Sequence, residues 1–160
     1  MTASAEPSTW KLPRLRIDRE GAWFDEEGEI THAGILANLL GNLQVDGQGH
    51  FLQIGPARVP VEVEDAPFIA VRAEREGDRL VLTLNDLTRE LLAVETLRFA
   101  ADAVPYCQVK DRRFACRLSR AAAYQLLQHV EQDEPSGRAT LVVGGARYPL
   151  PALSERPPER

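Results

Sequence analysis

Three arginines form the first candidate site in this sequence. Arg58 and Arg147 occupy the same place in two similar phrases, FLQIGPARVPV and TLVVGGARYPL. Arg120 precedes Tyr124 by four residues in a segment with helical spacing, so these two side chains are expected to share a helix face. A guanidinium offers a planar fork of donors to phosphate or carboxylate, and a tyrosine ring can stack on a ligand. These residues predict a site for a small anionic ligand, with solvated surface arginines and a helix-anchoring tyrosine as the alternative.

Asp65 is a further candidate for a ligand contact. In the segment Asp65-Ala66-Pro67 the proline drives Ala66 into an extended conformation, and the Asp65 carboxylate can accept backbone N–H groups at the resulting corner. That structural role is the alternative to ligand binding. Pro67 and Phe68 are expected in the hydrophobic core.

Catalytic and metal-binding motifs are absent from the sequence. His32, His50 and His129 are far apart, and none lies in HExxH or another close ligand pair. The two cysteines lack thioredoxin-like spacing, and there is no P-loop, GxSxG or GxGxxG. We therefore predict a protein that is not an enzyme and that uses no metal or cofactor. Chemistry assembled from residues distant in the sequence is the alternative.

Composition excludes several classes of function. The 160 residues are 44% hydrophobic, which suffices for one domain or two small ones, and the net charge of −5 argues against DNA or RNA as a partner. No apolar run approaches the length that spans a bilayer, so we expect no membrane association. The only cysteines, Cys107 and Cys116, fit a reducing cytoplasm. They fall opposite one another if their hairpin turns at Asp111-Arg112, either as two buried thiols or, under oxidation, as a strained disulfide.

The two phrases, residues 51–61 and 140–150, each predict a β-hairpin. Gly55-Pro56 and Gly144-Gly145 separate apolar arms, and glycine at the first central position suits a primed two-residue turn. The two arginines then point away from the apolar face. Proline cannot donate to a strand ladder, so an edge strand or a bulge is expected at two positions: Pro60 and Pro149.

A helical pattern precedes each phrase. One helix is expected from Thr31 until the glycines at 47–49, and a second over Ser119–Gln132. Hairpin patterns, LRIDREGAWF and YCQVKDRRFACRL, come before them, so hairpin, helix and hairpin follow one another twice, near Leu15–Val61 and Tyr106–Leu150. The predicted apolar stripes are Ile35, Leu36, Leu39, Leu40 and Leu43 in the first helix and Ala122, Ala123, Leu126, Leu127 and Val130 in the second.

The segment between the two copies predicts mainly strands. PFIAVRAEREGDRLVLTLND is typical of two strands joined at Gly77-Asp78, whereas residues 89–94 fit either a strand, which we favour, or a short helix. The chain is therefore expected to be α+β, with duplicated hairpin-helix-hairpin units on antiparallel sheets. We expect disordered ends at 1–11 and 154–160, an N-terminal domain over 12–65 and a C-terminal domain over 66–153.

The sequence resembles a bacterial family, domain of unknown function 1285. The resemblance is carried by the phrase VEDAPF (63–68) and by further segments that fall in the family's order and spacing: LRIDREGAWF, PFIAV, the Asn85-Asp86 corner, PYCQV from Pro105, and Arg120 with Tyr124. Two segments depart from the family: DEEGEITH replaces a Gly-Ser-Pro-Ile run, and Glu95-Thr96 replaces a His-Pro pair.

This resemblance implies a duplicated core whose C-terminal half is similar to a pleckstrin-homology barrel. It also implies a ligand site, for a nucleotide-like molecule, at the interface of the two halves, with a role in signalling. The leading hypothesis is a non-catalytic cytoplasmic module that senses a small anionic ligand through Arg58, Asp65, Arg120, Tyr124 and Arg147. The alternative is a protein-interaction module without a small-molecule ligand, since such a barrel presents edge strands and helix faces to a partner protein.

Overall fold

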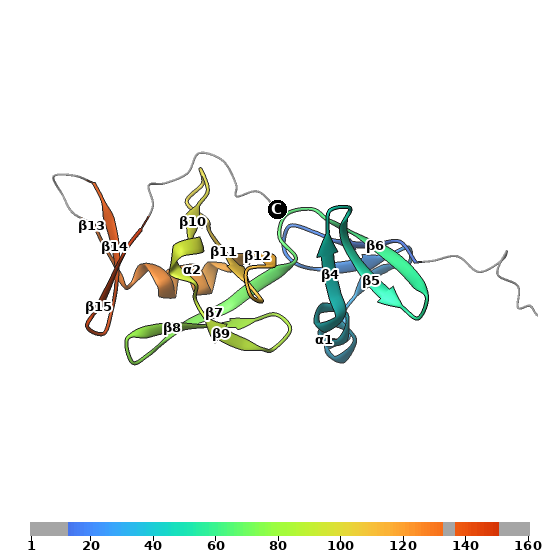
Figure 1. Cartoon of the computed structure of the whole chain (residues 1–160), viewed down its shortest axis with the longest axis horizontal. Helices are drawn as coiled ribbons and strands as arrows, with labels where there is room; N and C mark the ends of the chain where they lie inside the picture. The colour runs from blue at the N-terminus through green and yellow to red at the C-terminus, as the bar shows by residue number, and fades with distance from the viewer. Residues whose placement is uncertain (1–12, 133–136, 151–160) are drawn as a thin grey trace, which may run out of the picture. The chain divides into compact units, whose positions relative to one another are not determined.

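The computed structural model of the chain describes residues 13–132 and 137–150 (Figure 1). The ends expected to be disordered, 1–11 and 154–160, lie outside the described residues. The chain divides into two compact units, Met1–Glu64 and Asp65–Arg160, called unit 1 and unit 2 below. This boundary falls one residue before the expected one. Among the described residues, no helix has the length and apolar character needed to cross a bilayer.

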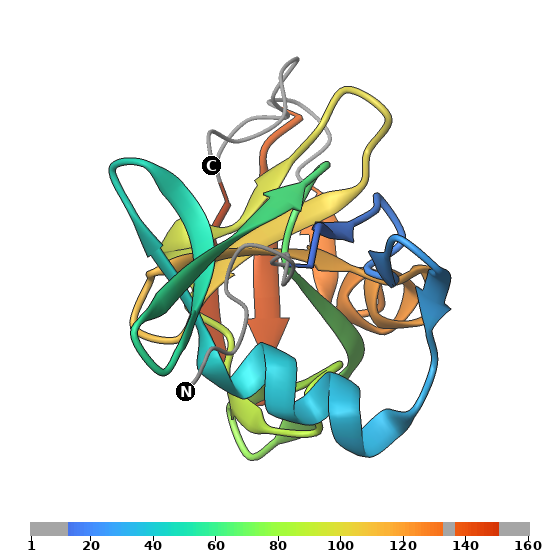
Figure 2. The same ribbon diagram turned by 90° about the vertical axis from the view of Figure 1, so that its right-hand side faces the viewer.

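From residue 13 onward, unit 1 contains one six-stranded sheet and one helix (Figure 2). The strand order is β3-β2-β1-β6-β5-β4, in which β1 and β6 are parallel and all other neighbours are antiparallel. The apolar side chains alternate along these strands, and the buried ones, such as Trp23, Val59 and Ile17, form the core of the unit. The strands are β1 (Leu15–Ile17), β2 (Trp23–Asp25), β3 (Gly28–Ile30), β4 (Leu43–Asp46), β5 (Gly49–Ile54) and β6 (Ala57–Val63).

The helix of unit 1, α1 (Ala33–Asn42), is shorter than predicted. Its N-cap is His32, whose Nδ1 accepts hydrogen bonds from the N–H groups of Gly34 and Ile35 at 3.1 and 3.3 Å. The helix ends at Asn42 because Gly41 and Asn42 both favour helix poorly. Leu43, which was expected in the helical stripe, instead begins β4.

The repeated phrase of unit 1 forms the predicted hairpin, β5 and β6. Gly55 has a φ of 57°, as the first central residue of a primed turn requires. Pro60, however, lies on an inner strand without a bulge, so that prediction was wrong. Residues up to Pro60 pair with β5, and β6 pairs with β1 only from Val61 onward, so the missing N–H falls where the strand changes partners.

Unit 2 begins with a second six-stranded sheet. Its order is β10-β11-β12-β7-β8-β9, and β12 runs parallel to β7. The join of β7 and β8 at Gly77-Asp78 is confirmed. The strand favoured over 89–94 is present only at 89–91, and Val94 begins a 3-10 helix. The elements are β7 (Phe68–Glu76), β8 (Arg79–Leu84), β9 (Arg89–Leu91), the 3-10 helix η1 (Val94–Thr96), β10 (Arg98–Phe99), β11 (Pro105–Val109) and β12 (Phe114–Leu118).

The sheet of unit 2 does not close into a barrel. Its end strands, β9 and β10, are not paired with each other. Side chains connect this region to β11 instead: Glu90 accepts the Lys110 N–H with both carboxylate oxygens at 3.2 Å, and Thr96 Oγ1 accepts the Gln108 N–H at 2.9 Å. The α+β class is confirmed, whereas the likeness to a pleckstrin-homology barrel stays a prediction.

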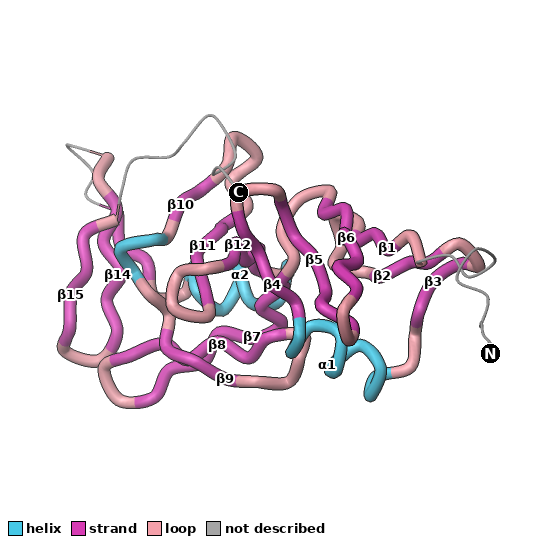
Figure 3. The backbone as a smooth tube through the Cα atoms, turned by 45° about the vertical axis from the view of Figure 1, so that its right-hand side comes forward, coloured by secondary structure: helices cyan, strands magenta, loops and turns pink. Residues whose placement is uncertain are grey.

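A helix and a three-stranded sheet complete unit 2 (Figure 3). The helix was predicted over Ser119–Gln132; Ser119 is its N-cap, and the helix ends at Leu127 and not at Gln132. Val130, expected in the helical stripe, begins a strand. The sheet order is β13-β14-β15, and Pro149 lies on the edge strand β15, as predicted. The elements are α2 (Arg120–Leu127), β13 (Val130–Gln132), β14 (Ala139–Val143) and β15 (Ala146–Pro149).

The duplication is present in the order of the elements. Each helix is preceded by a hairpin and followed by a three-stranded meander, β4-β5-β6 in one copy and β13-β14-β15 in the other. Leu43 pairs with Leu52, and Val130 pairs with Leu141, at equivalent points. The glycines of the two turns have nearly the same φ, 57° and 59°. The copies differ in pairing, because β6 joins the sheet of its leading hairpin whereas β15 does not.

Candidate functional site

Arg58 is bound within its own meander. Its two terminal nitrogens donate to the Asp46 carboxylate at 2.8 and 2.9 Å, and its guanidinium lies 3.8 Å from the centre of the Phe51 ring. The hydrogen bonds from Arg58, with help from the Gln48 N–H, lower the pKa of Asp46 to about 2. This arginine therefore already has the planar, bidentate carboxylate partner that an anionic ligand was expected to provide.

Arg147 repeats this arrangement in unit 2. It lies on the last strand of the second meander and contacts Glu131, on the first strand, at 3.6 Å. Both side chains are 62% exposed, so the pair is weaker than the one formed by Arg58. In both copies the arginine of the third strand reaches a carboxylate on the first. The duplicated arginines thus have a structural function that each copy preserves.

Arg120 and Tyr124 lie together on the outer face of α2. Arg120 is the first residue of the helix, and Tyr124 is 67% exposed one turn later. No acidic side chain within 13–132 or 137–150 forms an ion pair with Arg120. Ala122 and Leu126 point to the opposite side and are buried. Arg147 is also exposed but is paired with Glu131, so Arg120 and Tyr124 are the exposed part of the predicted site whose arginine has no ion pair within the described residues.

Asp65 has a structural environment. Its side chain is buried, with 7% of the residue exposed, and it accepts a hydrogen bond from the Tyr106 hydroxyl at 2.8 Å. Tyr106 packs in a small core with Ala66 and Ala100. Pro67 and Phe68 are buried, as predicted. Asp65 therefore links the start of unit 2 to β11. Of the five candidates, Arg58 belongs to unit 1 and the other four belong to unit 2.

A polar cluster in unit 2 was not predicted as a site. Asp86 is buried, and its carboxylate accepts hydrogen bonds from Lys110 Nζ at 2.9 Å and from Thr88 Oγ1 at 2.5 Å. Burial opposes ionisation of Asp86, but the hydrogen bonds from Thr88 and Lys110 outweigh it and lower the pKa of this carboxyl. Asn85-Asp86 stood out in the sequence only through the family resemblance. The cluster ties the loop after β8 to the loop after β11.

The loop after β11 has an unusual backbone. Lys110, Asp111 and Arg112 have φ values of 57°, 58° and 62°, a run of three left-handed residues without a glycine. Each such residue costs roughly 1–2 kcal/mol, so its neighbours must hold the turn. Glu90 binds the N–H of Lys110, and Glu95 contacts the Arg112 guanidinium at 3.1 Å. The turn is therefore fixed by two carboxylates from the region of β9 and η1.

An apolar groove of about 370 Å³ lies in unit 2, between β9 with η1 and the three-stranded sheet. Its lining includes the half-exposed Leu91 and the buried Leu141 and Val143. Arg79 and Glu95 add one charge of each sign. The volume is at the lower end of the range for ligand pockets, and the lining lacks the cluster of cations that a phosphate requires. The remaining lining residues are Leu80, Leu92, Ala93, Val94 and Tyr148.

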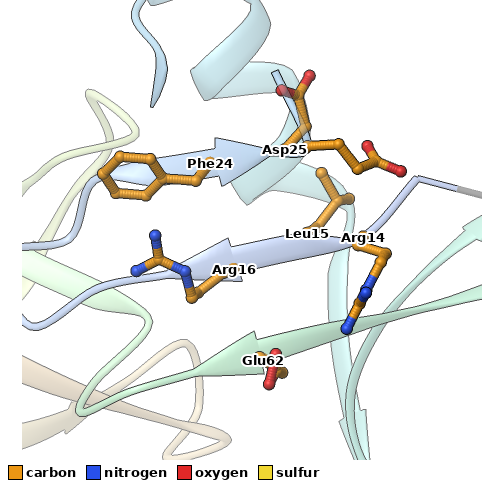
Figure 4. A pocket seen from close by; sticks show the side chains of 7 residues that line it. Arg14, Leu15, Arg16, Phe24, Asp25 and Glu62 are labelled. Atoms are coloured by element: carbon orange, nitrogen blue, oxygen red, sulfur yellow. The ribbon is translucent and has the colours of Figure 1, made fainter. Parts of the chain in front are cut away.

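A shallower hollow of about 230 Å³ lies on the sheet of unit 1 (Figure 4). Arg16 stands in register with Phe24 on one side and Glu62 on the other, and its guanidinium is 4.3 Å from the centre of the Phe24 ring. The other polar side chains of the hollow are those of Arg14, Asp25 and Glu26. Three carboxylates against two arginines do not favour an anionic ligand.

The two thiols lie opposite one another, as predicted. Cys107 pairs with Cys116 across β11 and β12, both are buried, and both are free. Burial raises the pKa of the Cys116 thiol well above its ordinary value, which disfavours the reactive thiolate. Disulfide formation between them under oxidation stays a prediction. Elsewhere in the described chain, no three His, Cys, Asp or Glu side chains are grouped so that they could hold a metal ion.

These features define a two-unit α+β protein whose polar clusters are mainly structural. Its fold is that of domain of unknown function 1285, which confirms the resemblance found in the sequence. The crystal structure of a DUF1285 family protein from Silicibacter pomeroyi DSS-3 matches with a TM-score of 0.71 and 24% identity, over 94% of this chain and 88% of that one. A DUF1285 family protein from Shewanella baltica OS155 matches with a TM-score of 0.61 and 24% identity, over 72% and 91% of the respective chains. No family model matches the sequence, and no curated protein is significantly similar to it.

Proposed function

We propose that this chain is a non-catalytic protein-interaction module, and that the groove of unit 2 receives an apolar segment of a partner protein. The observation that supports this proposal is an apolar groove with a half-exposed leucine, Leu91, at a sheet edge. Solvent-exposed apolar side chains that line a concavity commonly mark binding surfaces. Covering a leucine side chain contributes about 1.5–3 kcal/mol, so a few such contacts suffice for a transient complex.

A charge placed in the groove tests this function. We expect peptides selected from a random phage-displayed library on the wild-type protein to bind at least about tenfold more weakly to the Leu91→Glu variant, because a carboxylate there must be desolvated. Ile54→Glu is the matched control: Ile54 also lies on a strand and is 49% exposed, against 50% for Leu91, but it belongs to unit 1. Peptide affinities are measured by calorimetric titration. Equal affinity for the two variants would contradict the proposal.

Anion binding is the second candidate, and the exposed pair of Arg120 and Tyr124 supports it. We expect phosphate or a nucleotide, if bound there, to raise the melting temperature of the wild type. The Arg120→Ala variant should lose this stabilisation, and Arg147→Ala should keep it because Arg147 is paired with Glu131. A thermal-shift titration with phosphate, ATP and GTP makes the measurement. If none of these anions stabilises the protein, anion binding at Arg120 and Tyr124 is ruled out.

We also propose a cytoplasmic location for the protein. The two free, buried thiols support it, because disulfides are rare in the reducing cytoplasm.

A further inference from the structure

We infer that the partner segment binds to unit 2 as an additional β-strand along β9, with its apolar side chains in the adjoining groove. This inference rests on the proposed function and specifies its geometry. It identifies the partner as an extended segment with apolar residues at alternate positions. Strand addition to a sheet edge is a general mode of peptide recognition, in which main-chain hydrogen bonds give affinity and pockets give specificity.

The edge of β9 has backbone groups directed away from the sheet. β9 ends the six-stranded sheet and pairs only with β8. The Leu84 N–H donates to the Thr88 carbonyl, and the Leu92 N–H donates to the Leu80 carbonyl, both at 2.9 Å or less. Along an antiparallel strand, successive residues direct their backbone N–H and C=O groups alternately toward the paired strand and away from it. Thr88 and Leu92 bond to β8, so the N–H and C=O groups of Arg89 and Leu91 point away from the sheet. Within the described chain no hydrogen bond to these outward groups is present.

Natural sheet edges are usually protected, but this one carries exposed leucine side chains. Proteins commonly block edge strands with prolines, inward-pointing charges or covering loops. Leu91 lies on β9 and is 50% exposed, and Leu87, just before it, is 74% exposed. Both charged residues of the strand already have partners within unit 2, since Arg89 is bound to Glu76 on β7 and Glu90 accepts the Lys110 N–H. The edge thus presents two leucines beside the outward backbone groups.

The groove adjoins this edge, so the partner segment can be recognised through its side chains as well as through its backbone. Leu91 belongs to both the edge and the groove lining. The residue of an added strand that lies directly opposite Leu91 would therefore place its side chain against Leu91, in the groove. Residues two positions away on the same strand point to the same side. Glu95 is paired with Arg112, whereas Arg79 makes only a loose contact with Asp78 at 3.9 Å. An acidic residue in the segment therefore complements the groove.

Amide hydrogen exchange tests the binding mode. The probe is the synthetic form of the strongest peptide from the phage library, added to the whole chain. We expect exchange at the Arg89 and Leu91 amides to slow by about tenfold or more on binding, because each gains a hydrogen-bond partner. The Leu92 amide is the internal control, since it is already bonded to Leu80 and should change less. NMR follows each amide separately.

A second measurement uses the peptide backbone. N-methylation removes one N–H donor at a time, so methylation at alternate residues should abolish binding, while the residues between tolerate it. If the peptide binds and Leu91→Glu weakens it, but neither amide is protected and every N-methyl peptide binds equally, strand addition is wrong and the groove function stands. If no selected peptide distinguishes Leu91→Glu from Ile54→Glu, both the function and the inference are wrong.

Discussion

The Asp86→Ala variant is expected to lose about 2–4 kcal/mol of the free energy of unfolding. The side chain of Asp86 is 3% exposed, and its removal leaves Lys110 Nζ without its carboxylate in a partly buried position. The Thr88 N–H and hydroxyl lose the same acceptor. The strained turn at Lys110 loses one of its attachments as well. Denaturant unfolding, followed by a signal from unit 2, measures the loss.

The control for Asp86 is a carboxylate of the same unit at the surface. Glu131→Ala removes the exposed pair with Arg147 and is expected to cost less than about 1 kcal/mol. The acid limb of the stability curve gives a second readout. Because the folded-state pKa of Asp86 is lowered, its contribution is present above the ordinary Asp pKa and is lost as the pH falls through the folded value. The Asp86→Ala variant should therefore lose less stability on acidification than the wild type; an unchanged acid limb would contradict the assigned pairing.

Gly144→Ala is expected to destabilise unit 2 by about 2–4 kcal/mol. Gly144 has a φ of 59°, which disfavours alanine, and an added Cβ would lie 2.9 Å from the Gly77 carbonyl oxygen and 3.1 Å from the Asp78 Cα. Both neighbours are backbone atoms and cannot rotate away. The Tyr148 hydroxyl donates to the Asp78 carbonyl at 3.2 Å, so the same clash would disturb the attachment of β15 to the turn after β7. Thermal and denaturant unfolding measure the effect.

Two other glycines separate the causes of this effect. Gly55, the equivalent residue of unit 1, has a φ of 57° but nothing within 4 Å of an added Cβ, so Gly55→Ala should cost only the conformational strain, about 1–2 kcal/mol. Gly145 is the next residue in the same turn as Gly144 and also has open space around it. Gly145→Ala should change stability by less than about 1 kcal/mol. Equal costs at Gly144 and Gly145 would show that the contact with Gly77 is unimportant.

Local features of the fold could be predicted from the sequence, and non-local ones could not. The turns at Gly55 and Gly144 and the start of the second helix near Ser119 depend on a few adjacent residues. The ends of both helices were misplaced, because Leu43 and Val130 continue an apolar stripe although they belong to strands. The pairing of β1 with β6 depends on residues far apart in the chain, which no local pattern indicates. The change of partners at Pro60 follows from that pairing.

For the candidate site as well, the local features could be predicted from the sequence and the non-local ones could not. Arginines that recur in a duplication were correctly placed away from the apolar faces, but their partners, Asp46 and Glu131, lie on another strand. Those partners could be known only from the register of each meander. The Asp86 cluster joins two loops, and the groove beside Leu91 forms between two sheets. Sequence patterns indicate which residue types are present, whereas the sites depend on how separate elements meet.

The change of strand partners within β6 also constrains the order of folding. β5 and β6 are joined by a two-residue turn, and hairpins of this kind form in about 1–10 μs. β1 can pair with β6 only after the whole intervening chain has been closed into a loop, and such non-local parallel pairing is slow. The β4-β5-β6 meander is therefore expected to form first and to act as the template for β1. Pulse-labelled hydrogen exchange would then record protection in β5 before protection in β1.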